Sequence, residues 1–204
     1  MASETTDLVA LICSRLCHDL AGSIGAVNNG VELLAEETDA AMREEAIGLI
    51  AQSASDAARR LSFFRLALGS SGSMTEPMAY TEFTRVAKAY FAGGKLSLLL
   101  PATTEPLSKP LGKALLLGLS LAAQALPRGG SLSLVKDARA WLIRAEGTTL
   151  RWTDDVALGL GDGAVPAEPV AAIARYARDL AASAGHRLQA EPGETSLVLR
   201  FTAN

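Results

Sequence analysis

The stretch that decides the fold runs from Leu8 to Leu34, LVALICSRLCHDLAGSIGAVNNGVELL. At about 100° per residue, one face of a helix collects most of its apolar side chains. The members of this stripe are Val9, Ile12, Cys13, Leu16, Cys17, Leu20, Ile24, Val27, Val31 and Leu34. The pattern predicts a long helix over residues 7–36, with Thr6 or Asp7 as its N-cap.

A second apolar stripe follows and predicts a helix over residues 39–68. Its members are Met42, Ala46, Leu49, Ile50, Ser53, Ala57, Leu61, Phe64 and Leu68. Asp39 is the candidate cap, and the run GSSGS at 69–73 reads as a flexible linker. Residues 1–70 are therefore expected to form a helical hairpin. Because two helices cannot enclose a core, we expect two chains to pair into a dimeric four-helix bundle.

Residues 77–204 alternate between shorter helical and strand patterns. Helices are predicted over 80–91, 108–126 and 168–184, and strands over 96–100, 131–135, 187–190 and 196–201. A hairpin of 140–145 with 149–153 and a loop over 154–166 complete the prediction. This order favours an α/β sandwich. The whole chain is therefore expected to be α+β.

Composition excludes some functions. The chain has 204 residues, a net charge of -3, a pI near 5.5 and 5% aromatic residues, which argues against a nucleic-acid binder. No uninterrupted apolar run reaches the roughly 18 residues of a membrane span. The first residues, MASETTD, lack the basic start of a secretory signal. We therefore expect a cytoplasmic protein.

His18 falls at about 280° on the helical wheel, nearly opposite the apolar stripe. The residues that share this outer face are Ser14, Arg15, Ala21, Gly22, Gly25 and Asn29. The two glycines each cost a helix about 1 kcal/mol relative to alanine, a cost that suits the close approach of a partner. Asp19 follows His18 directly and can fix the tautomer of a nucleophilic imidazole. The alternative is a chance surface histidine, with the glycines serving helix–helix contact.

Ser14 to Leu20, SRLCHDL, resembles the histidine box of dimerising phosphotransfer helices in two-component signalling. The longer run from His18 to Leu34 is similar to the ChpT-type histidine phosphotransferases of bacterial cell-cycle relays. Residues 123–132 and 184–201 resemble the helix-to-strand passage and the closing strands of histidine-kinase ATPase domains. The resemblance implies a dimerisation and phosphotransfer domain over 1–70 and a degenerate ATPase-like domain over 77–204.

The resemblance also implies a role for each site residue. His18 would be the phosphoacceptor, Asp19 the acid or base that orients it, and Arg15 a group that steers either the acidic receiver pocket or the phosphoryl group. The implied receiver-docking residues are Ser14, Ala21, Gly22, Gly25 and Asn29. The implied partners are the receiver domain of a hybrid histidine kinase and response regulators of the CtrA and CpdR type.

The chain departs from the kinase pattern where a kinase holds nucleotide. Residues 118–125 contain no asparagine and no acid to hold magnesium, and GLGDG at 159–163 has its aspartate out of place for an adenine box. Without such ligands the charge of a triphosphate is not neutralised. We therefore expect no ATP and no intrinsic metal or cofactor, with Mg²⁺ supplied by the partner receiver.

Other residues admit other interpretations. Cys13 and Cys17 could suggest a zinc site, but the sequence offers no second pair of ligands. We therefore expect both cysteines to pack in the core. His186 at a helix end, and Trp141 and Trp152 on strands, are expected to be structural. The 159–163 stretch reads as a disordered surface loop. Three rival functions remain: an autophosphorylating histidine kinase, a non-catalytic dimeric adaptor, and an anti-sigma-type regulator.

Overall fold

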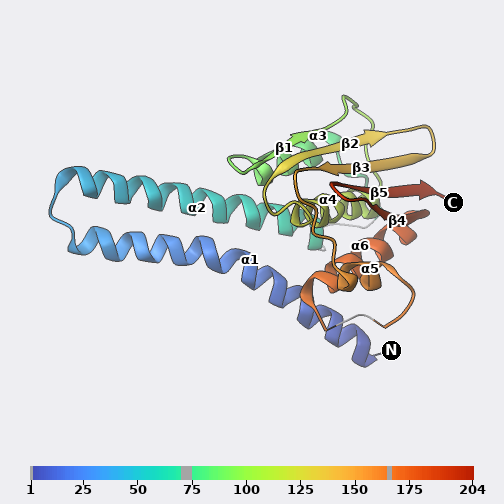
Figure 1. Ribbon diagram of the computed structural model, residues 1–204, viewed down its shortest axis with the longest axis horizontal. Helices are drawn as coiled ribbons and strands as arrows, with labels where there is room; N and C mark the ends of the chain where they lie inside the picture. Colours follow the sequence, from blue (N-terminus) through green and yellow to red (C-terminus); the bar gives the residue numbers. More distant parts are fainter. Residues whose placement is uncertain (1, 70–74, 165–166) are drawn as a thin grey trace.

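The computed structural model describes residues 2–69, 75–164 and 167–204, with side chains from residue 7 onward. Its first two helices, α1 (Ala2–Glu36) and α2 (Ala40–Leu68), form an antiparallel hairpin that projects from the rest of the molecule (Figure 1). The predicted hairpin is confirmed. So is the Asp39 cap, whose Oδ1 accepts hydrogen bonds from the backbone N–H groups of Ala41 and Met42, each at 3.0 Å.

The N-cap of α1 and the linker after α2 were both predicted from the sequence. Helix α1 begins at Ala2, so Thr6 and Asp7 lie inside it and the prediction that either caps it is wrong. The apolar pattern starts only at Leu8, which is why it placed the helix start too late. The linker predicted at 69–73 falls mostly outside the described residues.

The rest of the chain forms one five-stranded sheet with helices packed on one face (Figure 1). The strands lie in the order β1 (Leu96–Leu99), β2 (Gly130–Lys136), β3 (Ala140–Glu146), β5 (Ser196–Ala203) and β4 (His186–Pro192). Only β1 and β2 are parallel. The helices are α3 (Tyr80–Phe91), α4 (Lys109–Gln124), α5 (Asp154–Leu160) and α6 (Pro169–Ser183). The α+β fold class and the C-terminal α/β sandwich are confirmed.

Helix α4 forms the centre of the core. Every residue from Leu111 to Ala122 is buried. Gly118 lets this helix lie close to the sheet, because a Cβ there would come within 2.8 Å of Ile143 on β3 and 2.9 Å of Phe201 on β5. The C-terminal sandwich therefore has a hydrophobic core of its own.

The predicted hairpin of 140–145 with 149–153 is wrong. Strand β3 instead pairs with β2 on one side and β5 on the other, so neither of its edges is open to residues 149–153. The Arg151 backbone N–H donates to the Ala125 carbonyl at 2.8 Å. The predicted loop over 154–166 is also wrong in part, since 154–160 form α5.

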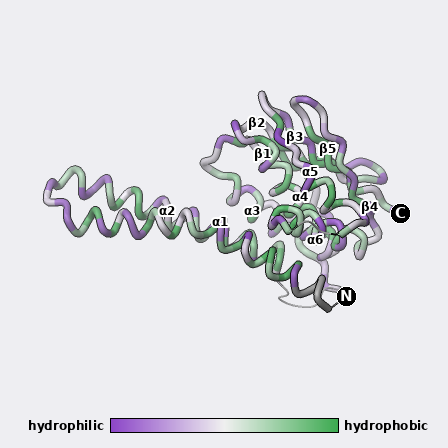
Figure 2. The backbone as a smooth tube through the Cα atoms, turned by 60° about the horizontal axis from the view of Figure 1, so that its bottom comes forward, coloured by the Kyte–Doolittle hydropathy of each residue, from purple (hydrophilic) through white to green (hydrophobic). Residues whose placement is uncertain are grey.

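The hairpin exposes much of its apolar surface. Hydrophobic stretches recur along both helices out to the tip (Figure 2). By length and composition, Asp7–Glu36 is apolar enough to cross a membrane: its most apolar 18-residue window has a mean hydropathy of 1.3, and none of that window is buried. Arg15, His18 and Asp19 interrupt this segment, so it contains no uninterrupted apolar run of 18 residues. A helix whose apolar face packs against a second copy of the chain can be equally long and equally apolar.

Candidate functional site

His18 stands on the outer face of α1, near the base of the hairpin. Its side chain is 82% exposed, as the helical wheel predicts. Asp19, one residue further along, is only 8% exposed and turns its Oδ1 to within 3.4 Å of the His18 Nδ1. An exposed imidazole therefore has a largely buried carboxylate beside one of its two nitrogens.

Arg15 fixes the carboxylate of Asp19. Its Nε donates to Asp19 Oδ2 at 3.0 Å across one helical turn, and the Arg15 side chain is 23% exposed. With one oxygen engaged by Arg15, the other is free to accept from the His18 Nδ1–H. In that tautomer Nε2 carries the lone pair and faces solvent. Arg15 thus lies at the site and holds Asp19, and its steering of a ligand stays a prediction.

The surface around His18 is open. Ser14, Ala21, Gly22 and Asn29 are exposed, and Gly25 is half-buried. A Cβ built on Gly22 or Gly25 would meet no atom within 4 Å. The predicted docking residues thus lie along the accessible side of α1, and Asn29 is about 16 Å from His18 along the helix axis. Whether a receiver docks there stays a prediction.

A cavity of about 330 Å³ opens beside Asp19, where the hairpin meets the C-terminal sandwich. Arg15 and Asp19 of α1 line it, together with Arg59 and Arg60 of α2 and Tyr90 of α3. The Tyr90 ring stacks on Phe63 of α2, with 3.9 Å between ring centroids. Burial raises the pKa of Tyr90, and the charge of Asp19 raises it further.

Sequence reasoning missed Arg60 and Tyr90. Nothing local to either residue marks it as part of a site. One signal was available, since folding an antiparallel hairpin about the turn at Asp39 brings residue 60 opposite residue 18. Tyr90 joins the site only through tertiary packing, which no periodic pattern reveals.

The cysteines do not behave as predicted. Both Cys13 and Cys17 are free thiols and exposed, so within a single chain neither is core filler. No helix or strand in the described part of the chain covers the edge of α1 that carries these two cysteines. Among the described residues no group of three or more His, Cys, Asp or Glu side chains is placed to hold a metal ion.

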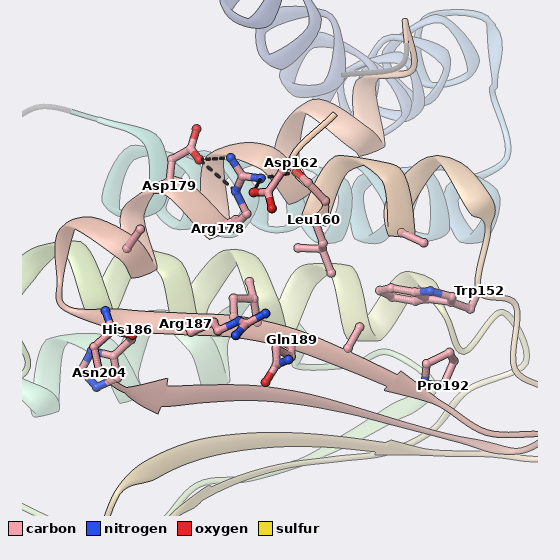
Figure 3. A pocket seen from close by; sticks show the side chains of 15 residues that line it. Trp152, Leu160, Asp162, Arg178, Asp179, His186, Arg187, Gln189, Pro192 and Asn204 are labelled. Atoms are coloured by element: carbon pink, nitrogen blue, oxygen red, sulfur yellow. Dashed lines mark hydrogen bonds and ion pairs between the residues drawn. The ribbon is translucent and has the colours of Figure 1, made fainter. Parts of the chain in front are cut away.

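A larger cavity, of about 660 Å³, lies away from His18 between α5, α6 and β4 (Figure 3). Trp152 and Leu160 line it, as does Arg178, which pairs with Asp162 at 3.2 Å and Asp179 at 2.9 Å. One guanidinium therefore bridges two carboxylates at this mouth. Trp152 is half-buried but lies on no strand, whereas Trp141 is buried on β3 as expected.

Residues 159–163 are not a loose loop in the structure. Gly159 lies inside α5 and packs on α6, where a Cβ would come within 2.5 Å of the Ala171 carbonyl oxygen. Arg175 and Arg178 of α6 donate hydrogen bonds to the carbonyls of Gly159, Gly161 and Gly163. The expectation of disorder is wrong because these arginines hold the segment. The His186 Nδ1 lies 2.9 Å from the Ala184 carbonyl oxygen, a contact that joins α6 to β4 and fits a structural role.

Known proteins resemble the chain along most of its length. Residues 80–196 match the family model of the histidine phosphotransferase C-terminal domain. Protein phosphotransferase ChpT of Brucella abortus is 38% identical over 168 residues, which cover 80% of this chain and 78% of that protein. A solved structure of a bacterial phosphotransferase aligns over 96% of both chains, with a TM-score of 0.81 and 32% identity. The histidine kinase domain of an Erythrobacter litoralis blue-light activated kinase aligns over 93% of this chain and 95% of that one, with a TM-score of 0.48 and 14% identity.

The ChpT-type resemblance seen in the sequence is thereby confirmed. The matched residues include the whole of α3 and α4 and most of the sheet. The alignment with the bacterial phosphotransferase also takes in the projecting hairpin, since it covers 96% of the chain. The chain belongs to the histidine phosphotransferase family.

Proposed function

We propose that this protein is a phosphorelay intermediate in which His18 carries the phosphoryl group. The observation that supports this most directly is the exposure of the His18 ring, 82%, next to an Asp19 carboxylate that is only 8% exposed. A nucleophile must reach its substrate, and the group that orients it must stay fixed. His18 and Asp19 divide these two tasks between them.

In the proposed step, the Nε2 lone pair of His18 attacks the phosphorus of a phospho-aspartate on a receiver domain. An N–P bond forms, the P–O bond to the aspartate breaks, and the aspartate leaves as a carboxylate. Asp19 stabilises the positive charge that develops on the ring through the Nδ1–H. The reverse step passes the phosphoryl group to the aspartate of a second receiver.

Arg15 contributes by holding Asp19 in this geometry. Ser14, Ala21, Gly22, Gly25 and Asn29 form the proposed receiver-docking surface. The open space above Gly22 and Gly25 supports this assignment, because a bulky side chain there would keep a partner from His18.

We further propose that residues 1–70 act as the dimerisation and phosphotransfer domain and residues 77–204 as a degenerate ATPase-like domain. Two members of the α1 stripe, Ile12 and Leu16, pack on the chain's own core. The other edge, including Ile24 and Val31, is exposed. This edge lies about 120° around the helix from His18. A four-helix bundle formed on it leaves both imidazoles open.

The partners and cofactors follow from this chemistry and from the family resemblance. The donor is the receiver domain of a hybrid histidine kinase, and the acceptors are response regulators of the CtrA and CpdR type. The receiver's acidic pocket supplies Mg²⁺, so the protein uses no ATP and no cofactor of its own. Such a relay operates in the cytoplasm.

Transfer of radiolabel from a purified phospho-receiver tests the proposal. Wild-type protein should gain an acid-labile label, and His18→Ala should gain none while keeping its dimer mass. His186→Gln changes the chain's other histidine and should behave as wild type. Unchanged transfer by His18→Ala would remove His18 from the mechanism. Label acquired from ATP alone, or ATP binding in calorimetry, would favour a kinase instead.

A further inference from the structure

Arg60 stands out in the cavity beside Asp19 because its charge is not balanced. Three guanidinium groups and two carboxylates line this cavity. Arg15 is paired with Asp19, and Arg59 is paired with Asp56. Arg60 makes no hydrogen bond or ion pair with any residue that the structure describes. One positive charge of the cavity is therefore available to a ligand.

An aromatic surface holds Arg60 in place. Its Cζ lies 5.8 Å from the centroid of the Tyr90 ring, a cation–π distance. Tyr90 is itself immobilised, since its ring stacks on Phe63 at 3.9 Å and with 23° between the planes. A cation–π contact uses the charge of a guanidinium and does not use up its N–H donors. Arg60 is thus a pre-positioned donor that has no acceptor among the described residues.

The packing of the hairpin places Arg60 at the level of His18. Gly30 of α1 lies against α2 between Ala46 and Ile50, where a Cβ would come within 2.6 Å of Ile50 Cγ1. Both helices rise about 1.5 Å per residue, in opposite directions. Twelve residues back from Gly30 is His18, and twelve residues on from the midpoint of 46 and 50 is Arg60.

We propose that Arg60, held on the face of Tyr90, forms an oxyanion site that binds phosphate and engages the phosphoryl group as it reaches His18. This inference rests on the proposed function for its role in transfer. Guanidinium groups match phosphate oxygens well, because two parallel N–H donors meet two oxygens. Such a donor stabilises the charge that develops on a phosphoryl group in transit.

Two probes test the site without a partner protein. Inorganic phosphate, followed by ³¹P NMR, reports binding alone. Phosphoramidate reports transfer, because the His18 Nε2–P bond forms as the P–N bond of the reagent breaks and ammonia leaves. Arg60→Gln should abolish phosphate binding and slow the labelling of His18 by about tenfold or more. Arg60→Lys should recover part of both.

Matched variants separate this role from structural damage. Arg65→Gln removes an exposed guanidinium of the same helix outside the cavity and should match wild type. Tyr90→Leu removes the ring that holds Arg60 and should resemble Arg60→Gln. Circular dichroism confirms that each variant folds.

The outcomes discriminate between this proposal and the proposed function. Unchanged phosphate binding and labelling in Arg60→Gln would overturn the oxyanion site. Slower transfer from a phospho-receiver, with normal phosphoramidate labelling, would overturn it too, since Arg60 would then contact the partner protein. If wild-type His18 accepts no label but phosphate binds in an Arg60-dependent way, the relay role fails and the anion site stands.

Discussion

Helices α1 and α4 are both rich in apolar residues, yet their surroundings are opposite. In α4, every residue from Leu111 to Ala122 is buried by the sheet and its neighbouring helices. In the part of α1 whose side chains are described, residues 7–36, Gly30 alone is buried. The sandwich completes its own core, whereas the hairpin leaves an apolar edge that its own chain does not cover. Apolar sequence therefore predicts a buried face, but not which chain buries it.

The largest expected difference between the two regions is in the unfolding free energy that each loses when one leucine is truncated to alanine. Leu117→Ala removes a side chain with no exposure and should cost about 2–5 kcal/mol of unfolding free energy at any protein concentration. Leu49→Ala changes a side chain that is 53% exposed, so its cost should appear only where chains associate. Urea unfolding at two protein concentrations measures both. If both variants lost the same unfolding free energy in dilute protein, the proposed difference between the two regions would be wrong.

A charge on the exposed edge of α1 tests whether a second copy covers it. Val31 is 52% exposed in the single chain, so Val31→Asp should leave a monomer intact. In a dimer the same carboxylate would be buried without a partner, at a cost of several kcal/mol. Sedimentation should then show dimerisation weakened by about 100-fold or more. Asn29→Asp, on the outer face, is the control, and equal effects of the two changes would contradict pairing on this edge.

Two glycines of α1 should respond in opposite directions to the same change. A methyl group at Gly22 meets open space, so Gly22→Ala should stabilise the helix by about 0.5–1 kcal/mol. At Gly30 it would come within 2.6 Å of Ile50 Cγ1, and overpacking typically costs about 1–3 kcal/mol. Thermal unfolding of both variants measures the difference. Stabilisation by both changes would mean that the helices are not in close contact at Gly30.

Local sequence predicted the long elements well. The stripes of both hairpin helices, the Asp39 cap, and the helices at 80–91 and 168–184 all depend on residues close together in the chain. The errors fall where tertiary contacts decide. Residues 149–153 are not a strand because β5 already occupies the edge of β3 that they would need. Helix α5 has only seven residues, too few for a periodic pattern to detect.

The same limit applies to the site. Exposure of His18 and the adjacency of Asp19 could be predicted because both follow from position on one helix. The Arg15–Asp19 pair fits a spacing of one turn, although the sequence analysis did not predict this pair. The Arg60–Tyr90 contact joins residues from α2 and α3 across the junction, and only the folded chain brings them together.

The length of the hairpin has a practical consequence. The turn at Thr38 and Asp39 lies twenty residues beyond His18, or about 30 Å along the helix axis, and far from the sheet (Figure 1). A fluorophore or spin label attached at this tip would neither obstruct His18 nor disturb the core. The distance between two such labels would report directly how a pair of hairpins is aligned.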